Sequence, residues 1–370
     1  MRKLLITGGA GFIGSNFVHY WLDQHPGDRV VVLDALTYAG NVMNLEPARG
    51  RQELRFVRGN ICDSDLVETL LREERVDTIV NFAAESHVDR SITGPDAFIE
   101  TNVIGTHSLL KAARKCWLQD KTVPRHRFHH VSTDEVYGSL GPDDPSFTET
   151  TPYAPNSPYS ASKAASDHLV RAYHHTYGLD TTTSNCSNNY GPYHFPEKLI
   201  PLMIVNMLQG KPLPVYGDGK NVRDWLHVSD HCRAIDLIVA NGRSGEVYNV
   251  GGGSEVENIT LVQSLCMLVD QAGKSGLLRK EHFPDAPAVG GKSTSMLIKY
   301  VTDRPGHDRR YAIDCRKIES EIGYRAQVKL EKGLHDTLQW YLRNTEWWRA
   351  VMAGTYRQNA GAEFGSLGRR

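Results

Sequence analysis

The sequence predicts a doubly wound α/β fold, with a Rossmann-type parallel sheet and a smaller C-terminal substrate-binding lobe. Up to about residue 185, short apolar β-rich runs alternate with helix-like segments, which is typical of a parallel sheet covered by helices on both faces. Three glycines, Gly8, Gly11 and Gly14, follow the first of these runs directly. After about residue 186 the rhythm changes to loops rich in glycine, proline, asparagine and aromatic residues, which indicates a second lobe of different construction.

The elements of the first half follow one another in strand–helix order. The strands are predicted at KLLIT (3–7), RVVVLD (29–34), ELRFV (53–57), VDTIVNF (76–82) and RFHHVS (127–132). The helices are predicted over 12–25, 64–74, 97–117 and 158–176. Crossover connections between parallel strands are almost always right-handed, which gives the doubly wound arrangement.

The length of the chain predicts two domains, because its 370 residues exceed the roughly 250–300 at which a single core stops growing. We predict a Rossmann domain over 1–186 that also receives about 225–250, and an interleaved substrate-binding lobe over 187–350. Helices in that lobe are predicted at about 198–210, 229–241, 260–271 and 330–345. Residues 273–300 are predicted to form a surface excursion, and 353–370 a flexible tail with little periodic apolar content.

The composition indicates which partners, metal sites and cellular compartment to expect. The 42 basic and 43 acidic residues leave a net charge of -1, which gives no electrostatic case for nucleic acid or an anionic membrane as a partner. No apolar run approaches the roughly 20 residues of a membrane span, and the early glycines are unlike a signal peptide. The six cysteines are scattered without a CxxC pair, so no zinc site or disulfide framework is expected. We therefore expect a soluble cytoplasmic protein without a metal.

The glycine cluster predicts a dinucleotide site. A GxxGxxG spacing at the start of a helix permits a tight turn and a close approach of the backbone to a pyrophosphate. Ordinary turns also use glycine, but Asp34 ends the second predicted strand twenty residues after Gly14. A carboxylate there can accept hydrogen bonds from both ribose hydroxyls and repels the extra phosphate of NADP, so NAD is favoured. An aspartate that simply faces water at a strand end is the plainer alternative.

Two short motifs further along predict a reaction centre. YSASK places Tyr159 and Lys163 four residues apart, on one face of a helix. A tyrosine beside an ammonium group loses its proton more easily, so this pair can act as a base on a sugar hydroxyl. STDEVYG places Asp134 and Glu135 directly after Thr133, where the fifth strand ends. Such a carboxylate pair is either a solvated strand end or an acid and a base in a site.

Eight longer stretches give the sequence a wider resemblance. They are TGGAGFIGS, DALTYAGN, NFAAESHVDRSI, STDEVYG, YSASKAASDHLVRAY, NCSNNYGPYHFPEKLIP, YGDGKNVRDWLHVSDH and DRPGHDRRYAID, and they run from residue 7 to about residue 314. In them the chain resembles the extended short-chain dehydrogenase/reductase superfamily and, more closely, its dTDP-glucose 4,6-dehydratases. The resemblance implies a lyase of deoxysugar biosynthesis with tightly bound NAD, regenerated in each turnover. Such an enzyme oxidises the hexose at C4, eliminates water across C5–C6 and returns the hydride to C6.

The resemblance also implies a role for each site residue. Tyr159 and Lys163 would serve the oxidation at C4, Thr133 would contact the C4 oxygen, Asp134 would be the acid and Glu135 the base of the elimination. The cofactor would contact Gly8, Gly11, Phe12, Ile13, Gly14, Asp34, Leu36, Thr37, Asn60, Ile61, Ala83, Ala84, Thr101, Tyr159, Lys163 and Asn189. The nucleotide sugar would contact Ser86, Thr133, Asp134, Glu135, Asn188, Lys198, Leu199, Pro214, Tyr216, Arg223, Asn258, Arg304 and His307. Asn60 departs from the family pattern, which has aspartate there, although an amide still offers hydrogen bonds to adenine.

Several alternatives stay open at the level of sequence. The residues do not distinguish thymine from uracil, so dTDP-glucose as substrate is implied by the resemblance, with UDP-glucose as the minor alternative. A 4-epimerase or decarboxylase of the same fold would also oxidise C4, but epimerisation has no need of Asp134 and Glu135. An NAD-binding sensor or scaffold would keep the glycines and Asp34 alone. The resemblance further implies a homodimer, joined in a four-helix bundle by the helices at 97–117 and 158–176.

Overall fold

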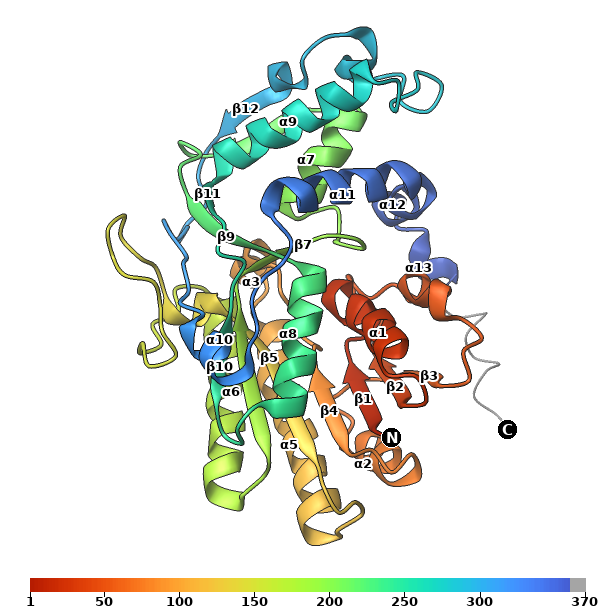
Figure 1. The fold of residues 1–370 in the computed structure, drawn as a ribbon, viewed down its shortest axis with the longest axis vertical. Coiled ribbons are helices and arrows are strands. Elements are labelled where there is room, and N and C mark those ends of the chain that lie inside the picture. The colour runs from red at the N-terminus through yellow and green to blue at the C-terminus, as the bar shows by residue number, and fades with distance from the viewer. Residues whose placement is uncertain (360–370) are drawn as a thin grey trace.

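The structure, a computed structural model, describes residues 1–359. Its main feature is a sheet of seven strands in the order β10-β6-β5-β4-β1-β2-β3, all of them parallel (Figure 1). The strands are β1 (Lys3–Thr7), β2 (Arg29–Asp34), β3 (Leu54–Arg58), β4 (Thr78–Asn81), β5 (Arg127–Thr133), β6 (Thr181–Cys186) and β10 (Val247–Val250). The chain order reverses direction on either side of β1, as in a Rossmann sheet, so the predicted fold class is confirmed.

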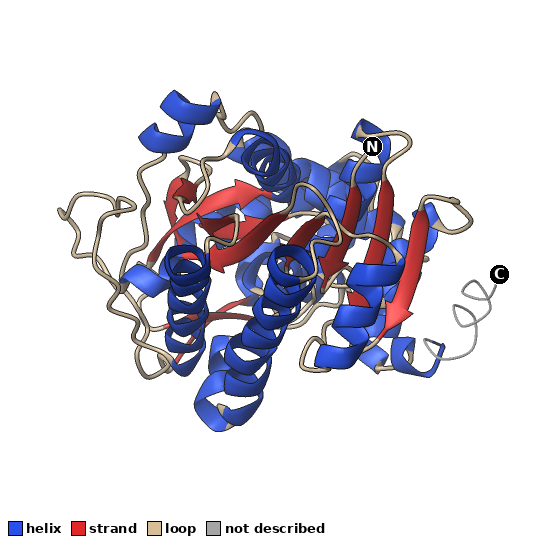
Figure 2. Cartoon of the chain, turned by 90° about the horizontal axis from the view of Figure 1, so that it is seen from below, coloured by secondary structure: helices blue, strands red, loops and turns tan. Residues whose placement is uncertain are grey.

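Helices cover both faces of this sheet (Figure 2). The helices on one face are α1 (Phe12–Gln24) and α8 (Val228–Asn241), and those on the other are α2 (Ser64–Glu73), α5 (Thr106–Ala113) and α6 (Pro158–Tyr177). In β1, Leu4 and Ile6 pack with the first set and Leu5 packs with the second. A strand covered on both sides is usually apolar throughout, which is why an unbroken apolar run marks such a strand in the sequence.

The apolar patterns do not predict β6, whose sequence is TTTSNC although all six of its residues are buried. Its hydroxyl groups have partners inside the sheet, because His129 on β5 lies 3.0 Å from Thr182 Oγ1 and 3.1 Å from Ser184 Oγ. Buried polar groups are tolerated when they are hydrogen-bonded. A search for apolar runs therefore passes over this strand.

The helix predicted at 97–117 is longer and less regular than expected. It runs continuously through α4 (Asp96–Phe98), η2 (Ile99–Gly105), α5 and η3 (Arg114–Gln119), and η2 and η3 have π-helical geometry. Short π-helical stretches are often found at functional sites. A short helix not predicted from the sequence, α3 (Val88–Thr93), precedes it.

A second group of elements packs around a core of its own, above the sheet in Figure 1. Its strands are β7 (Asn188–Tyr190), β9 (Val222–His227) and β11 (Glu255–Glu257) in one small sheet, and β8 (Leu213–Tyr216) and β12 (Ile298–Val301) in another. Its helices are α7 (Leu199–Leu208), α9 (Asn258–Lys274), α11 (Leu330–Arg343) and α12 (Thr345–Ala353). Between these elements the chain returns to the large sheet with α8 and β10, and α10 (Arg316–Ile322) packs on β10 and α8.

Two segments differ from their predicted character. Residues 273–300 are not merely a surface excursion, because Leu278, Phe283 and Ala288 are buried in the core around α9. Of the predicted flexible tail over 353–370, the described part is helical: Ala353 ends α12, and α13 (Tyr356–Asn359) follows. Tyr356 is buried, and the rest of that predicted tail lies outside the described residues.

Some general properties bear on function. Within residues 1–359, no helix is long and apolar enough to cross a membrane. In the same range, no three His, Cys, Asp or Glu side chains come together in a way that could hold a metal ion. All six cysteines are free thiols.

Candidate active site

The glycine turn between β1 and α1 packs so closely against neighbouring backbone that side chains would not fit at two of its glycines. Gly8 has a positive φ of 66°, and a Cβ there would lie 2.7 Å from the Ala83 nitrogen. A Cβ on Gly14 would lie 2.3 Å from the Gly8 oxygen. Gly11 is the N-cap of α1 and provides no side-chain cap, so the first N–H groups of the helix remain available to a phosphate. This turn fits the pyrophosphate of a dinucleotide.

Asp34 is fixed at the end of β2 by two backbone hydrogen bonds. Its Oδ2 accepts from the Ala10 N–H at 2.9 Å and its Oδ1 from the Leu36 N–H at 2.8 Å. Burial raises the pKa of Asp34, and the two N–H donors act against that shift. The carboxylate is thus held rigidly against the glycine turn, in the place where a ribose would meet it.

The Asp34→Ala variant is expected to bind NAD more weakly. Loss of hydrogen bonds to a charged acceptor should raise the dissociation constant for NAD by about 10- to 100-fold. Calorimetric titration with NAD tests this, and Asp23→Ala, which removes an exposed carboxylate on α1, is the control. An unchanged affinity in Asp34→Ala would remove Asp34 from the ribose role.

A cavity of about 350 Å³ lies along the carboxyl edge of the sheet. Among the predicted cofactor residues, those that line it are Gly8, Gly11, Phe12, Ile13, Gly14, Asp34, Thr37, Asn60, Ile61, Ala83, Ala84, Thr101, Tyr159, Lys163 and Asn189. Leu36 does not line it and contributes only its N–H to Asp34. The predicted catalytic and substrate residues that line it are Ser86, Thr133, Glu135, Asn188, Lys198 and Leu199.

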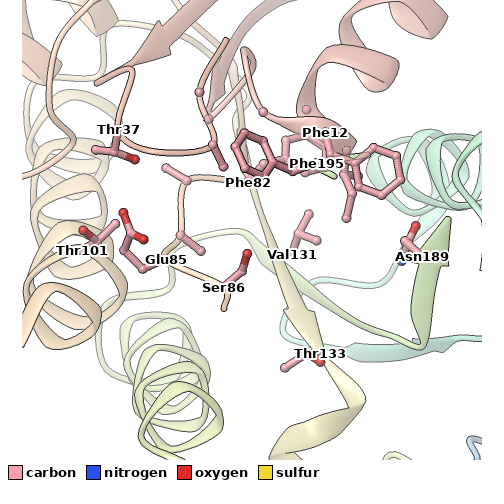
Figure 3. A pocket seen from close by; sticks show the side chains of 18 of the residues that line it. Phe12, Thr37, Phe82, Glu85, Ser86, Thr101, Val131, Thr133, Asn189 and Phe195 are labelled. Atoms are coloured by element: carbon pink, nitrogen blue, oxygen red, sulfur yellow. The ribbon is translucent and has the colours of Figure 1, made fainter. Parts of the chain in front are cut away.

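The cavity has an aromatic side and a polar end (Figure 3). The aromatic side chains that gather on one side are Phe12, Phe82 and Phe195, and the polar side chains at the far end are Thr37, Glu85 and Thr101. Thr133 lies at the end of β5, away from both groups. Except for Asp134 and Leu36, the predicted catalytic residues and the predicted cofactor residues therefore share one continuous space.

Asp134 begins the short helix η4 (Asp134–Tyr137) directly after β5 and is 1% exposed. Its Oδ1 accepts a hydrogen bond from Thr133 Oγ1 at 3.4 Å, while its Oδ2 is buried and has no hydrogen-bond partner among residues 1–359. Burial raises the pKa of Asp134 well above its ordinary value, and the charges of Glu135 and Asp224 raise it further. Asp134 therefore tends to hold a proton, as a general acid must.

The Asp134→Asn variant is expected to be more stable than the parent but much less active. In the native state the pKa of Asp134 lies above the ordinary value of 3.8. At pH values between these two pKa values the native state binds more protons than the unfolded state, so the stability of the parent protein falls as pH rises. Asparagine carries no buried charge, so the variant's gain in melting temperature should grow from about pH 4 upward and reach a few degrees. Melting curves at several pH values test this; a difference that does not change with pH would contradict it.

Glu135 differs from its neighbour because it faces the cavity and three cations. Burial raises its pKa, but Lys198, Arg223 and Arg304 all oppose that shift. Lys198 also lines the cavity, and its Nζ donates to the Ser86 carbonyl at 2.9 Å. Two adjacent carboxyl groups thus have different surroundings: the largest charge effects come from carboxylates at Asp134 and from cations at Glu135. Pairs of this kind commonly divide into an acid and a base.

Tyr159 and Lys163 lie in the first two turns of α6. That helix begins with a Ser157 capping box and Pro158, which fix its N-terminus. Lys163 is 3% exposed, and its Nζ donates to the Val131 carbonyl at 2.8 Å and lies 3.3 Å from His130 Nε2. Burial lowers the pKa of His130 to about 4, so this ring is neutral near pH 7 and can accept a hydrogen bond from the ammonium group.

In the free protein, Lys163 is not among the main influences on the pKa of Tyr159. Burial raises the pKa of Tyr159 well above its usual value, and the charge of Glu135 raises it further, while a hydrogen bond from Thr133 lowers it. Lys163 directs its ammonium group toward the β5 backbone and His130 instead. The sequence spacing places the two side chains on one helix face but does not reveal where the ammonium group points.

The remaining predicted substrate residues lie outside the cavity wall: Asp134, Pro214, Tyr216, Arg223, Asn258, Arg304 and His307. Several of them are neighbours. The Tyr216 and His307 rings lie 6.2 Å apart, and Arg223 and Arg304 both act on the pKa of Glu135. Arg223 donates to the Val222 and Asp308 carbonyls at 2.8 and 2.9 Å, and Arg304 pairs with Asp89 at 3.1 Å. The structure thus brings a basic cluster close to the reaction centre.

Sequence reasoning missed part of the cavity wall. Tyr38, Glu85, His194 and Phe195 all line it. His194 stacks on Phe12, with ring centroids 4.2 Å apart, and burial lowers its pKa to about 3. Glu85 directly follows Ala84, so the edge of β4 could have indicated it. The other three lie in loops, where no periodicity marks an inward-facing side chain.

The fold and this site define a nucleotide-sugar enzyme of the NAD-binding short-chain dehydrogenase/reductase type, and three comparisons refine that class. The family model described as GDP-mannose 4,6 dehydratase matches residues 5–337. The dTDP-glucose 4,6-dehydratase of Xanthomonas campestris is 58% identical over 359 residues, which span 96% of this chain and 98% of that protein. The chain belongs to the dTDP-glucose 4,6-dehydratase family.

Two solved structures of this family are close matches. The Streptomyces venezuelae dTDP-glucose 4,6-dehydratase, with NAD and TYD bound, is 50% identical with a TM-score of 0.83, over 95% of this chain and 100% of that chain. The Bacillus anthracis dTDP-glucose 4,6-dehydratase, in complex with NAD, is 47% identical with a TM-score of 0.82, over the same shares of both chains.

Proposed function

We propose that this protein converts dTDP-glucose to dTDP-4-keto-6-deoxyglucose. The observation that carries the proposal is the pair Asp134 and Glu135 near Tyr159, with Glu135 and Tyr159 in the wall of a cavity that begins at the glycine turn. Oxidation at C4 alone, as in a 4-epimerase, gives these two carboxyl groups no task. Elimination of water across C5–C6 requires both of them, one as the base at C5 and the other as the acid at the C6 hydroxyl.

The cofactor is NAD, and the glycine turn and Asp34 would hold it. When bound, NAD supplies the hydride acceptor for the oxidation at C4 and the hydride donor for the reduction at C6. Gly8 and Gly14 allow the tight turn that leads into α1, whose free N–H groups would bind the pyrophosphate, and Asp34 would accept hydrogen bonds from the ribose of the adenosine. Thr37, Glu85 and Thr101 supply polar groups at the far end of the cavity.

The oxidation at C4 depends on Thr133 and Tyr159. We assign Tyr159 as the base that takes the C4 hydroxyl proton, with Thr133 holding the same oxygen. Tyr159 lies near the N-terminus of α6, where the helix dipole favours a negative charge. Lys163, fixed by Val131 and His130, places a positive charge one helical turn away.

The elimination depends on the different charge states of the carboxyl pair. A C4 ketone makes the C5 proton acidic, and Glu135, beside three cations that oppose the rise of its pKa on burial, removes it. Asp134, whose surroundings favour the protonated form, gives its proton to the C6 hydroxyl as water leaves. General acid and base groups of this kind each contribute about 10²- to 10⁴-fold to a rate.

The second group of elements, within 187–350, would bind the nucleotide diphosphate. Arg223, Arg304 and Lys198 supply cations for the phosphates, and His307 lies beside Tyr216, whose ring could stack on the pyrimidine. We assign Asn188 and Ser86 to the sugar, Leu199 and Pro214 to the walls of this site, and Asn258 to a polar contact. Within the described residues, its Oδ1 is buried without a hydrogen-bond partner.

The decisive experiment incubates the purified protein with dTDP-glucose. A 4-keto-6-deoxy sugar, recognised by its absorbance at alkaline pH, supports the proposal, whereas an epimer would contradict it. A parallel incubation with UDP-glucose measures the choice of base. No product from either sugar would indicate a binding protein instead.

We also propose that the protein acts as a cytoplasmic homodimer. A reducing compartment suits its six free thiols. Large apolar side chains near α5 and α6 are exposed: Ile99 at 48%, Ile104 at 52% and Tyr177 at 41%. Since α5 and α6 contact each other, two copies could join them into a four-helix bundle that covers this surface.

The Ile104→Glu variant is expected to shift the protein from dimer to monomer, because a charge would have to be buried in the bundle. Size-exclusion chromatography with light scattering measures the mass directly. Met267→Glu, at an equally exposed position on α9, is the control. A monomeric parent protein would contradict the proposal at once.

A further inference from the structure

The C-terminal helices α12 and α13 contact the segment that forms one wall of the cofactor cavity. This segment, Ala35–Asn44, is called here the cofactor loop. It follows Asp34, and Ala35, Thr37, Tyr38, Ala39 and Gly40 line the cavity. Figure 1 shows α12 and α13 descending from the second group of elements to the region beside α1. They lie beyond residue 337, where the match to the family model ends.

One contact joins α12 to the end of the cofactor loop. Trp347 Nε1 donates to Asn44 Oδ1 at 2.8 Å. Asn44 is 1% exposed, and its own Nδ2 donates to the Ala10 carbonyl at 2.9 Å, inside the glycine turn. The Ala10 N–H in turn donates to Asp34. A chain of hydrogen bonds thus leads from the C-terminal indole to the carboxylate that would hold the ribose.

A second contact joins α13 to the middle of the cofactor loop. The Tyr356 hydroxyl donates to the Tyr38 carbonyl. Phe195 lies between the two, with its ring centroid 5.6 Å from that of Tyr38 and 6.2 Å from that of Tyr356. Because both Tyr38 and Phe195 line the cavity, this aromatic cluster closes it from outside.

The cofactor loop also packs closely against the Asp34 carboxylate, which would hold the ribose. A Cβ added to Gly40 would lie 2.8 Å from Asp34 Oδ1, so the loop backbone and the carboxylate are in close contact. Loops of this kind open more readily than the strands that flank them. A ligand held between Asp34 and this loop is expected to leave faster when the loop moves, and α12 and α13 contact the loop at two points.

We infer that Trp347 and Tyr356 are positioning residues that clamp the cofactor loop and slow the release of NAD. The inference rests on the proposed cofactor, and it explains how an enzyme that regenerates NAD in each turnover can keep it between turnovers. Neither side chain touches the reacting atoms. Their effect is exerted through Asn44 and Tyr38.

The test measures the dissociation of NAD from Trp347→Phe, Tyr356→Phe and the double variant. Each protein is loaded with labelled NAD and chased with an excess of unlabelled NAD. Loss of one hydrogen bond is expected to speed release by about 3- to 10-fold, and loss of both by roughly the product of the two factors. Tyr356→Phe keeps the ring and its packing, whereas Trp347→Phe also removes part of an indole that packs against Tyr193 and Trp340, so its control must lose the same part of a ring.

The matched control is Trp348→Phe. Trp348 lies on the same helix and its Nε1 donates to the Tyr341 carbonyl at 3.0 Å, inside the core of the second group of elements. The Trp348→Phe substitution removes an indole hydrogen bond of the same type but leaves the cofactor loop unchanged. NAD should therefore dissociate from this variant at the parental rate. Parental release rates in the Trp347 and Tyr356 variants would overturn the inference. So would equal acceleration in Trp348→Phe, since that would reflect general loosening.

The outcome is separable from that of the proposed function. Release of NAD is measured without any sugar, so a failed dehydratase assay leaves this result unaffected. Conversely, a protein that makes the keto sugar but releases NAD at the same rate in all variants retains its function and loses only the clamp.

Discussion

The Glu135→Gln variant accumulates reduced, enzyme-bound cofactor when it is mixed with dTDP-glucose. That result is expected because Tyr159 can still accept the C4 proton while the amide cannot remove the proton at C5. The keto intermediate then has no route forward, and turnover should fall by about 10²- to 10⁴-fold. The absorbance of the reduced nicotinamide and the yield of keto sugar are measured in the same cuvette.

The control for this variant is Glu149→Gln. Glu149 is also a largely buried glutamate, and it accepts the Asn249 N–H at 2.9 Å, outside the cavity wall. Burial raises its pKa as well, so the substitution changes a similar group in a place without a substrate. Turnover at the parental rate in Glu135→Gln would refute the assignment of Glu135 as the base.

The Tyr159→Phe variant is expected to fail one step earlier. Without the phenol, nothing takes the C4 hydroxyl proton, so neither reduced cofactor nor keto sugar should form, and the rate should fall by about 10²- to 10⁴-fold. The absence of reduced cofactor separates this variant from Glu135→Gln and thereby orders the two steps. Binding of NAD is measured separately, because the glycine turn and Asp34 remain intact.

The Tyr20→Phe variant is the control for the loss of a phenol. The Tyr20 hydroxyl donates to Asp236 Oδ2 at 3.0 Å, away from the cavity. It should form keto sugar at the parental rate. Reduced cofactor appearing in Tyr159→Phe at the same rate as in Glu135→Gln would show that another group takes the C4 proton.

The sequence predicts much of the fold because parallel strands covered on both faces are usually apolar. The apolar runs RVVVLD and KLLIT are recognisable as strands for this reason, and the glycine turn directly follows KLLIT. The strand TTTSNC is not, because it is polar, and the hydroxyl groups of Thr182 and Ser184 find a partner in His129 on the neighbouring strand. Pairing across a sheet is a tertiary property that no local pattern carries.

The residues of the candidate site likewise fall into those that the sequence predicts and those that it does not. Residues at the carboxyl ends of strands, such as Asp34 and Thr133, are predicted well because position along the chain fixes position at the sheet edge. Tyr38 and Phe195 belong to loops whose course depends on distant contacts with Tyr356. The surroundings that separate Asp134 from Glu135 also arise from distant residues, such as Asp224 and Lys198, so the sequence alone gives no physical reason for their different pKa shifts.

The return of the chain to the large sheet after β9 has a consequence for biosynthesis. α8 packs against α1, and β10 pairs with β6 at the edge of the sheet. The chain must therefore have emerged from the ribosome as far as residue 250 before the N-terminal half can complete its own sheet. Neither half is a separable module, so genetic dissection at residue 186 should yield insoluble fragments, and calorimetry of the whole chain should record one cooperative transition.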